Sequence, residues 1–138
     1  MKQEDKELLL KDVCSRLPYK LVCEVKYKEE GKYKTSNMVL SGVFTNEAYF
    51  TSKEGSIYST DYKPYLFPLS SMTEEIMDEI YNNTGIYDID VDSPVHLEVG
   101  TTFEDLTKVI HILHKHHIDY RGLIPMDLAI DATGKNIY

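Results

Sequence analysis

Histidine is the residue type in this chain best suited to hold a metal ion, and four of the five histidines fall between residues 111 and 117. His111 and His114 are three residues apart in a segment of helical periodicity, so one helix face could present both to a metal ion, with His116, His117 or Asp119 as further ligands. The chain has no His-Glu-x-x-His pattern, however. We therefore expect structural or solvated histidines and no metal or other cofactor. A metal-dependent hydrolase using His111, His114 and His117 is the alternative.

The segment Asp-Tyr-Arg-Gly, residues 119–122, contains one of only two arginines. Asp119 could act as a base and Arg121 as a clamp for an anion, because a guanidinium binds carboxylate or phosphate in bidentate geometry. No nucleophile lies at a spacing that would pair with such a base. We therefore predict no catalytic residues. We expect a helix-ending turn with a left-handed Gly122, in which Arg121 pairs with Asp119 or a helix carboxyl end.

Lysine and tyrosine alternate in the segment 19–36, which is basic although the whole chain has a formal charge of -8. Ammonium groups would neutralise the phosphates of a nucleotide-like ligand while a tyrosine ring stacked on its base. A second aromatic segment, residues 61–68, could stack on a planar ligand or seat a partner peptide. The candidate ligand-binding residues are Lys26, Tyr27, Lys28, Lys32, Tyr33, Lys34, Tyr62, Lys63, Tyr65 and Arg121.

Size and composition indicate one folded domain spanning residues 1–138, with 42% hydrophobic and 28% charged residues. The negative charge argues against a duplex nucleic acid as partner, because lysine and arginine normally dominate phosphate binding. No apolar run approaches the roughly 20 residues that span a bilayer, and the amino terminus lacks the features of a signal peptide. We therefore expect a cytoplasmic protein without a membrane partner. Cys14 and Cys23 are expected to be buried thiols.

The first half of the chain changes from helical to strand periodicity at Pro18. Apolar residues at helical spacing predict a helix over residues 4–17. Alternation from Tyr19 predicts a strand, followed by a hairpin turn at 29–32 and a second strand in which Gly42 marks a bulge. Two further strands follow, over residues 47–52 and 57–62. Four consecutive strands favour an antiparallel meander, curled into a small barrel.

The second half is expected to leave the sheet over residues 62–81, because Pro64 and Pro68 cannot donate to a strand ladder. A capping-box pattern at Ser71 predicts a short helix. One or two strands are expected in residues 86–100. A second capping box at Thr101 begins a helix that should end near Gly122. The predicted fold is α+β, with an amino-terminal helix, a curled and mostly antiparallel sheet, and a carboxy-terminal helix that covers the sheet.

Three segments resemble a group of small proteins from gut Bacteroidales and from their phages and mobile elements. These are QEDKELLLKDVCSRLPY at residues 3–19, KPYLFPLSSMTEE at 63–75 and HHIDYRGLIPMDLAI at 116–130. The chain departs from the pattern at Phe67, where a basic residue is expected, and in its DATGKNIY ending. The resemblance implies a phage or mobile-element setting in gut bacteria. The group has no assigned activity, so no catalytic residues are carried over.

Together these features favour a non-enzymatic binding protein, an accessory or anti-defence factor. It would sequester a small anionic, nucleotide-like ligand or block a host protein. A pure protein-protein interaction module is an alternative, for which an acidic surface and the aromatic segment 61–68 would suffice. Assembly of several copies stays open.

Overall fold

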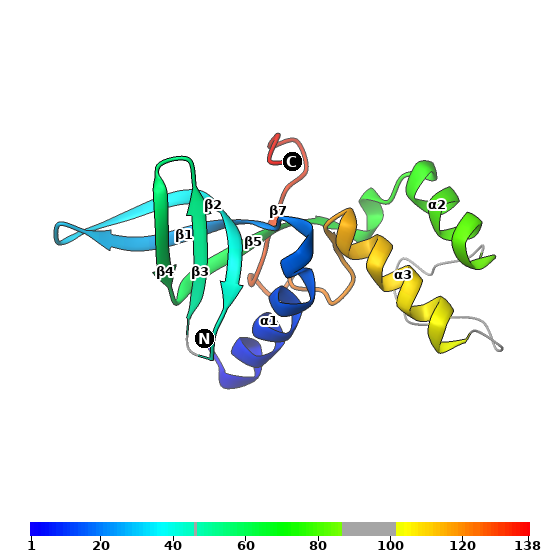
Figure 1. Ribbon diagram of the computed structural model, residues 1–138, viewed down its shortest axis with the longest axis horizontal. Helices are drawn as coiled ribbons and strands as arrows, with labels where there is room; N and C mark the ends of the chain where they lie inside the picture. The colour runs from blue at the N-terminus through cyan, green and yellow to red at the C-terminus, as the bar shows by residue number, and fades with distance from the viewer. Residues whose placement is uncertain (46, 87–101) are drawn as a thin grey trace.

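The computed structural model describes residues 1–45, 47–86 and 102–138. Within these ranges the fold is α+β, with a mixed sheet at one end of an elongated molecule and a pair of helices at the other (Figure 1). The helices are α1 (Gln3–Arg16), α2 (Glu74–Thr84) and α3 (Phe103–Lys115). The strands are β1 (Val22–Glu29), β2 (Lys32–Val43), β3 (Ala48–Ser52), β4 (Gly55–Ser59), β5 (Asp61–Pro68), β6 (Ile118–Asp119) and β7 (Ile130–Asp131).

The sheet has the strand order β4-β3-β2-β1-β5-β6, and β7 also pairs with β5. Strands β1 to β5 pair antiparallel, as expected for a meander, whereas β6 and β7 pair parallel to β5. The sheet is not closed into a barrel by any strand pairing among the described residues. The prediction of a mainly antiparallel sheet is therefore confirmed, and the barrel is not.

The hairpin of β1 and β2 follows directly from its sequence. Cys23 and Val25 are buried while Lys26 and Lys28 are exposed, which is the alternation that predicted a strand. Glu30 and Gly31 both have positive φ, 51° and 78°, as the two-residue turns that match strand twist require. The predicted bulge is present as well, because the pairing of β2 with β3 shifts register between Leu40 and Gly42.

The segment 61–68 does not leave the sheet, which corrects the prediction made from its prolines. It forms β5, with Pro64 opposite Cys23 in the last pair with β1 and Pro68 in the last pair with β6. A proline is tolerated where a stretch of pairing ends, because no further ladder hydrogen bond needs its nitrogen. β5 thereby joins the meander to the helical end of the molecule (Figure 1).

Among the described residues, the buried apolar side chains form two clusters. In the first, Leu9 and Val13 of α1 pack against the sheet, where Val25, Phe50 and Leu66 are fully buried. In the second, α2 and α3 pack on each other and on β6. Its buried members are Ile76, Ile80, Ile86, Val109, Ile112, Leu113 and Ile118. The expected covering of the sheet by the carboxy-terminal helix is not confirmed, because α3 packs against α2.

Both predicted helix starts differ from the observed ones, because α2 and α3 are capped by other residues than those predicted. Thr73 caps α2 by accepting the Ile76 amide at 3.3 Å, so α2 begins after Thr73 and not at Ser71. Thr102 caps α3. α3 ends at Lys115, well before Gly122, and His117 takes a left-handed conformation with φ 58°. The strands expected in residues 86–100 fall almost wholly outside the described residues.

Two further expectations concern the thiols and the membrane. Cys23 is buried and unpaired, as predicted, and burial raises the pKa of its thiol. Cys14 is exposed, so that prediction is wrong for Cys14, which lies off the face of α1 that carries Leu9 and Val13. None of the helices in the described ranges is long and apolar enough to cross a membrane.

Candidate functional site

The predicted ligand-binding residues of the β1–β2 hairpin are divided between the two faces of the sheet. The pairing register places Tyr27 opposite Lys34 and Lys28 opposite Tyr33, and neighbouring residues of a strand point to opposite faces. One face carries Lys26, Lys28 and Tyr33, and the other carries Tyr27, Lys32 and Lys34. The hairpin therefore separates Lys32 and Lys34 from Lys26, Lys28 and Tyr33.

The predicted lysines also differ in whether their charge is already paired. Lys34 lies 2.9 Å from the Glu29 carboxylate, which raises the pKa of Lys34, and Lys63 lies 2.8 Å from Asp127. Lys26, Lys28 and Lys32 make no ion pair with the described residues. The Lys28 ammonium instead lies 5.8 Å from the centre of the Tyr33 ring. One face of the hairpin thus carries two ammonium groups, those of Lys26 and Lys28, that have no ion-pair partner among the described residues.

The tyrosines of β5 are built into the sheet. Tyr65 is only 6% exposed, and its hydroxyl donates to Asn37 Oδ1 at 2.9 Å, so it offers no free ring face for stacking. Tyr62 is half-buried and packs against Phe50 with 5.1 Å between ring centres. Burial raises the pKa of Tyr62 to about 12. Of the two rings, only Tyr62 reaches a surface cavity.

Arg121 does not pair with Asp119, which corrects the predicted turn. The Asp119 carboxylate accepts the amides of Leu123 and Ile124 at 2.9 and 2.8 Å, and so holds the turn that contains Gly122, whose φ is 76°. Arg121 reaches back across the fold and donates to Asp12 Oδ1 at 2.9 Å. The left-handed glycine is therefore confirmed, while the partner of the arginine is a residue of α1.

Asp12 binds both arginines of the chain, forming an ionic cluster between α1 and the segment after α3. Arg16 donates from Nε to Asp12 Oδ2 at 2.8 Å and from Nη2 to the Ile118 carbonyl at 2.7 Å. The side chains of Asp12 and Arg16 are both fully buried. The Tyr120 ring lies 5.4 Å from one guanidinium and 5.0 Å from the other. The cluster thus joins the two apolar cores.

Each of the three histidines proposed as metal ligands contacts a tyrosine instead. His111 Nδ1 is hydrogen-bonded to the Tyr19 hydroxyl, and His114 Nε2 lies 2.7 Å from the Tyr120 hydroxyl. His117 is stacked on Tyr138, with 3.6 Å between ring centres. Within residues 1–45, 47–86 and 102–138, no group of three or more histidine, cysteine or acidic side chains is arranged to hold a metal ion.

Two of these imidazoles are held neutral by their surroundings. Burial, followed by the charge of Arg16, lowers the pKa of His114 to about 3. Burial and Arg16 likewise lower the pKa of His117 to about 4. Neutral imidazoles fit beside two guanidinium groups, where a third positive charge would be unfavourable.

One surface cavity opens where β4 turns into β5 beside the β1–β2 hairpin. The Ser59 hydroxyl donates to the Lys26 carbonyl at 2.7 Å, which fixes this corner against β1. A hollow of about 550 Å³ lies beside this corner. Its lining includes Lys26, Tyr27, Lys28, Tyr33 and Tyr58, so it brings together four of the predicted ligand-binding residues. We call it the hairpin cavity.

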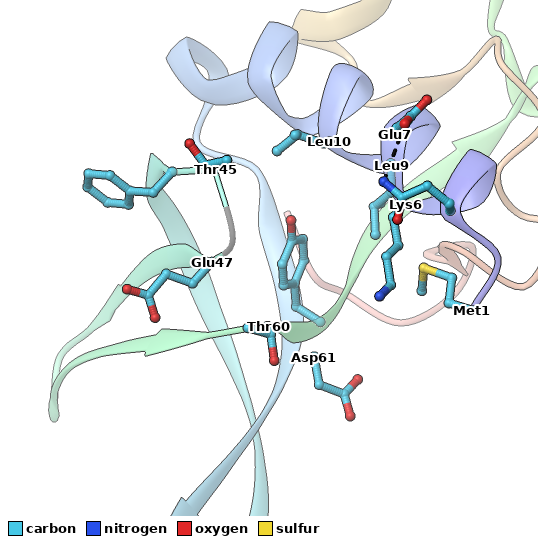
Figure 2. Close-up of a pocket in the computed structure, with 12 residues that line it drawn as sticks. Met1, Lys6, Glu7, Leu9, Leu10, Thr45, Glu47, Thr60 and Asp61 are labelled. Atoms are coloured by element: carbon cyan, nitrogen blue, oxygen red, sulfur yellow. Dashed lines mark hydrogen bonds between the residues drawn. The ribbon is translucent and has the colours of Figure 1, made fainter.

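A second cavity, of about 630 Å³, lies between the amino-terminal end of α1 and the loop after β2. Figure 2 shows Met1, which precedes α1, and Lys6 of α1 on one side, Thr45 and Glu47 across from them, and Thr60 and Asp61 below. The other lining residues are Gln3, Glu7, Leu9, Leu10, Phe44 and Tyr62. We call it the helix cavity.

The two cavities share Glu47, Thr60 and Asp61, so they meet at the corner. We call the two adjoining cavities together the corner groove. Phe44 lines the helix cavity and Tyr58 lines the hairpin cavity, and the two residues are 51% and 56% exposed. Their ring centres are 5.8 Å apart. No local residue pattern indicates this arrangement, since it depends on which strands become neighbours.

Known proteins offer no template for interpreting this groove. The chain matches no protein-family model, no curated protein and no solved structure. Function has to be inferred from the residues themselves and from the surfaces that the fold assembles.

Proposed function

We propose that this protein is a non-enzymatic binding protein that blocks a partner protein through the corner groove. The observation that carries the proposal is the meeting of two cavities at one corner, beside the exposed rings of Phe44 and Tyr58. Clustered exposed aromatic side chains are unusual on a surface without a partner and are enriched at the centres of protein interfaces.

The chemistry of the described residues supports binding better than catalysis. Asp119, Arg121 and His114, which are the residues best suited to chemistry, are each engaged in contacts that hold the fold. A metal-dependent hydrolase has less support, because its candidate ligands His111, His114 and His117 each contact a tyrosine. The corner groove instead offers aromatic surface and unpaired charges of both signs, which suits recognition of another protein.

The setting of the proposed activity comes from the resemblance to the Bacteroidales group. A small accessory protein of a phage or mobile element that blocks a host protein would act as an anti-defence factor in the host cytoplasm. Such a factor needs a binding surface and no active site. The corner groove is the surface that we assign to this role.

The proposal is tested by isolating the protein from host cells and weighing its complexes by native mass spectrometry. We expect one host protein in a stoichiometric complex that is lost when Phe44 and Tyr58 are both replaced by alanine, because truncating a central aromatic anchor typically costs about 2 kcal/mol or more. The matched control is Phe103→Ala, which removes an aromatic ring that is 85% exposed on α3, away from the groove. A complex that survives the double replacement would contradict the assignment.

A second candidate is a small anionic ligand of nucleotide type in the hairpin cavity. It is favoured by the unpaired ammonium groups of Lys26 and Lys28 beside the Tyr33 ring, and a volume of about 550 Å³ lies in the usual range for such ligands. Calorimetry with linear and cyclic nucleotides at low and moderate salt tests it. If it holds, Tyr33→Ala weakens binding roughly ten- to a hundredfold. No heat from any nucleotide would remove this candidate.

A further inference from the structure

We infer that the hairpin cavity is an open seam of the sheet, between β1 and β4, which takes an extended segment of the partner protein as an additional strand. The segment carries an acidic side chain with an apolar one on either side of it. This inference rests on the proposed function and specifies how the partner is held. Two features support it, the hydrogen-bonding pattern at the edge of β1 and the side chains on the two faces of that edge.

β1 has a strand neighbour on both sides for only part of its length. Its pairing with β5 ends at Lys26 and Asp61, because the chain turns at Thr60 between β4 and β5. Beyond this point β1 pairs with β2 alone among the described residues, and β4 is the last strand of the sheet. The hairpin cavity is lined by residues 26–28 of β1 and 57–59 of β4. Successive residues point to opposite faces, so the cavity lies at the edges of both strands and not over one face.

The backbone amide and carbonyl of Lys28 point into this seam. Glu29 and Lys32 close the two-residue turn, and the closing pair of such a turn exchanges ladder hydrogen bonds. The next pair does not, so the polar groups of Lys28 point away from β2. The same alternation holds two residues earlier, where the Lys26 carbonyl accepts the Ser59 hydroxyl of β4 at 2.7 Å. Neither backbone group of Lys28 has a hydrogen-bond partner among the described residues.

A strand lying antiparallel to β1 would bond both groups of Lys28 with the amide and carbonyl of a single residue. The side chain of that residue would stand directly opposite Lys28, on the same face of the sheet. This face carries the ammonium groups of Lys26 and Lys28, which make no ion pair with the described residues. A carboxylate is the complementary side chain at this position.

The residues before and after the acidic one would point to the other face of the sheet. On that face the seam is lined by Tyr27 and Ile57, which are both half-buried. Ile57 also packs against the apolar core of the sheet. Apolar side chains suit these two positions, because they would bury more surface beside that core.

Three forms of one short peptide, blocked at both ends, test the inference by nitrogen-15 NMR titration of the whole protein. The parent is Thr-Val-Glu-Val-Thr, the second form has lysine in place of glutamate, and the third has a methyl group on the glutamate backbone nitrogen. We expect the parent to shift the Lys28 amide resonance. The second form should bind about three- to fivefold more weakly, because it places like charges opposite each other. The third should bind about fivefold more weakly, because it loses a backbone hydrogen bond.

Two replacements of Lys28 separate the backbone bond from the charge. Lys28→Thr keeps the amide and removes the ammonium group, so the preference for glutamate over lysine should fall while methylation still weakens binding. Lys28→Pro also removes the amide, which the ladder to β2 does not use, and should weaken parent binding about fivefold beyond Lys28→Thr. Should Lys28→Pro not fold, the methylated peptide tests the other bond of the same pair on the unmodified protein. A methylated form that binds as tightly as the parent, or an unmoved Lys28 resonance, overturns the inference.

Failure of this inference can be told apart from failure of the proposed function. If a host protein is captured and is lost with Phe44 and Tyr58 replaced, while the methylated peptide binds like the parent, the groove is used without strand addition. If no host protein depends on the groove, the proposed function itself fails, whatever the peptides do. Dimers of this chain that Lys28→Pro dissociates and Lys28→Thr retains would assign the seam to a second copy and overturn the inferred occupant.

Discussion

Replacing Asp12 with alanine is expected to lower the free energy of unfolding by about 3–5 kcal/mol, because it removes the carboxylate that compensates a fully buried guanidinium. Arg16 would keep only its bond to the Ile118 carbonyl, and Arg121 would lose its 2.9 Å contact. Chemical denaturation followed by circular dichroism measures the loss. The matched control, Glu4→Ala on the exposed side of the same helix, should change stability by less than about 0.5 kcal/mol.

A second variant separates loss of charge compensation from loss of packing. Asp12→Leu combined with Arg16→Met removes both buried charges and keeps apolar volume, so it should be more stable than Asp12→Ala alone. Equal destabilisation of the two variants would show that packing and not charge accounts for the effect. A change below about 1 kcal/mol for Asp12→Ala would contradict a cluster that joins the two cores.

Mild acid is expected to destabilise the protein strongly, well before its carboxylates titrate. His114 and His117 have pKa values of about 3 and about 4 in the folded protein, against about 6.5 in an unfolded chain. Below pH 6.5 the unfolded state therefore binds more protons, and each histidine costs about 1.4 kcal/mol per pH unit. Their stabilisation is fully present above pH 6.5 and is lost as the pH falls toward 4. Between pH 6.5 and 5 the two together account for about 3 kcal/mol.

The histidine origin of this slope is checked by denaturation of single variants across that pH range. His114→Gln and His117→Asn should each remove about half of the slope, because each deletes one titrating imidazole. Both variants also lose a contact and so are less stable at pH 7.5, which does not affect the comparison of slopes. An unfolding free energy that stays flat between pH 6.5 and 5 would contradict neutral, buried imidazoles.

Short-range patterns predicted the local structure well. The helix at the amino terminus, the turn at Glu30 and Gly31, and the bulge at Gly42 all follow from spacing and turn chemistry that neighbouring residues determine. β5 was missed because a proline is excluded from a strand ladder only where its nitrogen must donate, and the sequence does not reveal where pairing ends. The predicted end of α3 is wrong because His117 adopts a left-handed conformation, which is uncommon for any residue other than glycine.

The candidate site was less predictable, because it is built from long-range neighbours. Asp12 and Arg16 have the spacing of a helical ion pair, but nothing local indicates that both are buried or that Arg121 joins them. The lysines and tyrosines of the hairpin were grouped by closeness in sequence, and strand alternation then placed them on opposite faces. The corner groove needs α1, the loop after β2 and the corner before β5 to meet, which only the tertiary fold determines.

The central claim, that the corner groove receives a partner protein, is tested most directly by crosslinking inside host cells. A photoreactive benzophenone side chain would replace Tyr58 at the groove or, as the control, Phe103 on α3; both positions are exposed. Irradiation should yield one covalent adduct with a host protein from position 58 and none from position 103. Adducts from position 103 alone, or from neither position while the complex is present, would contradict binding at the groove.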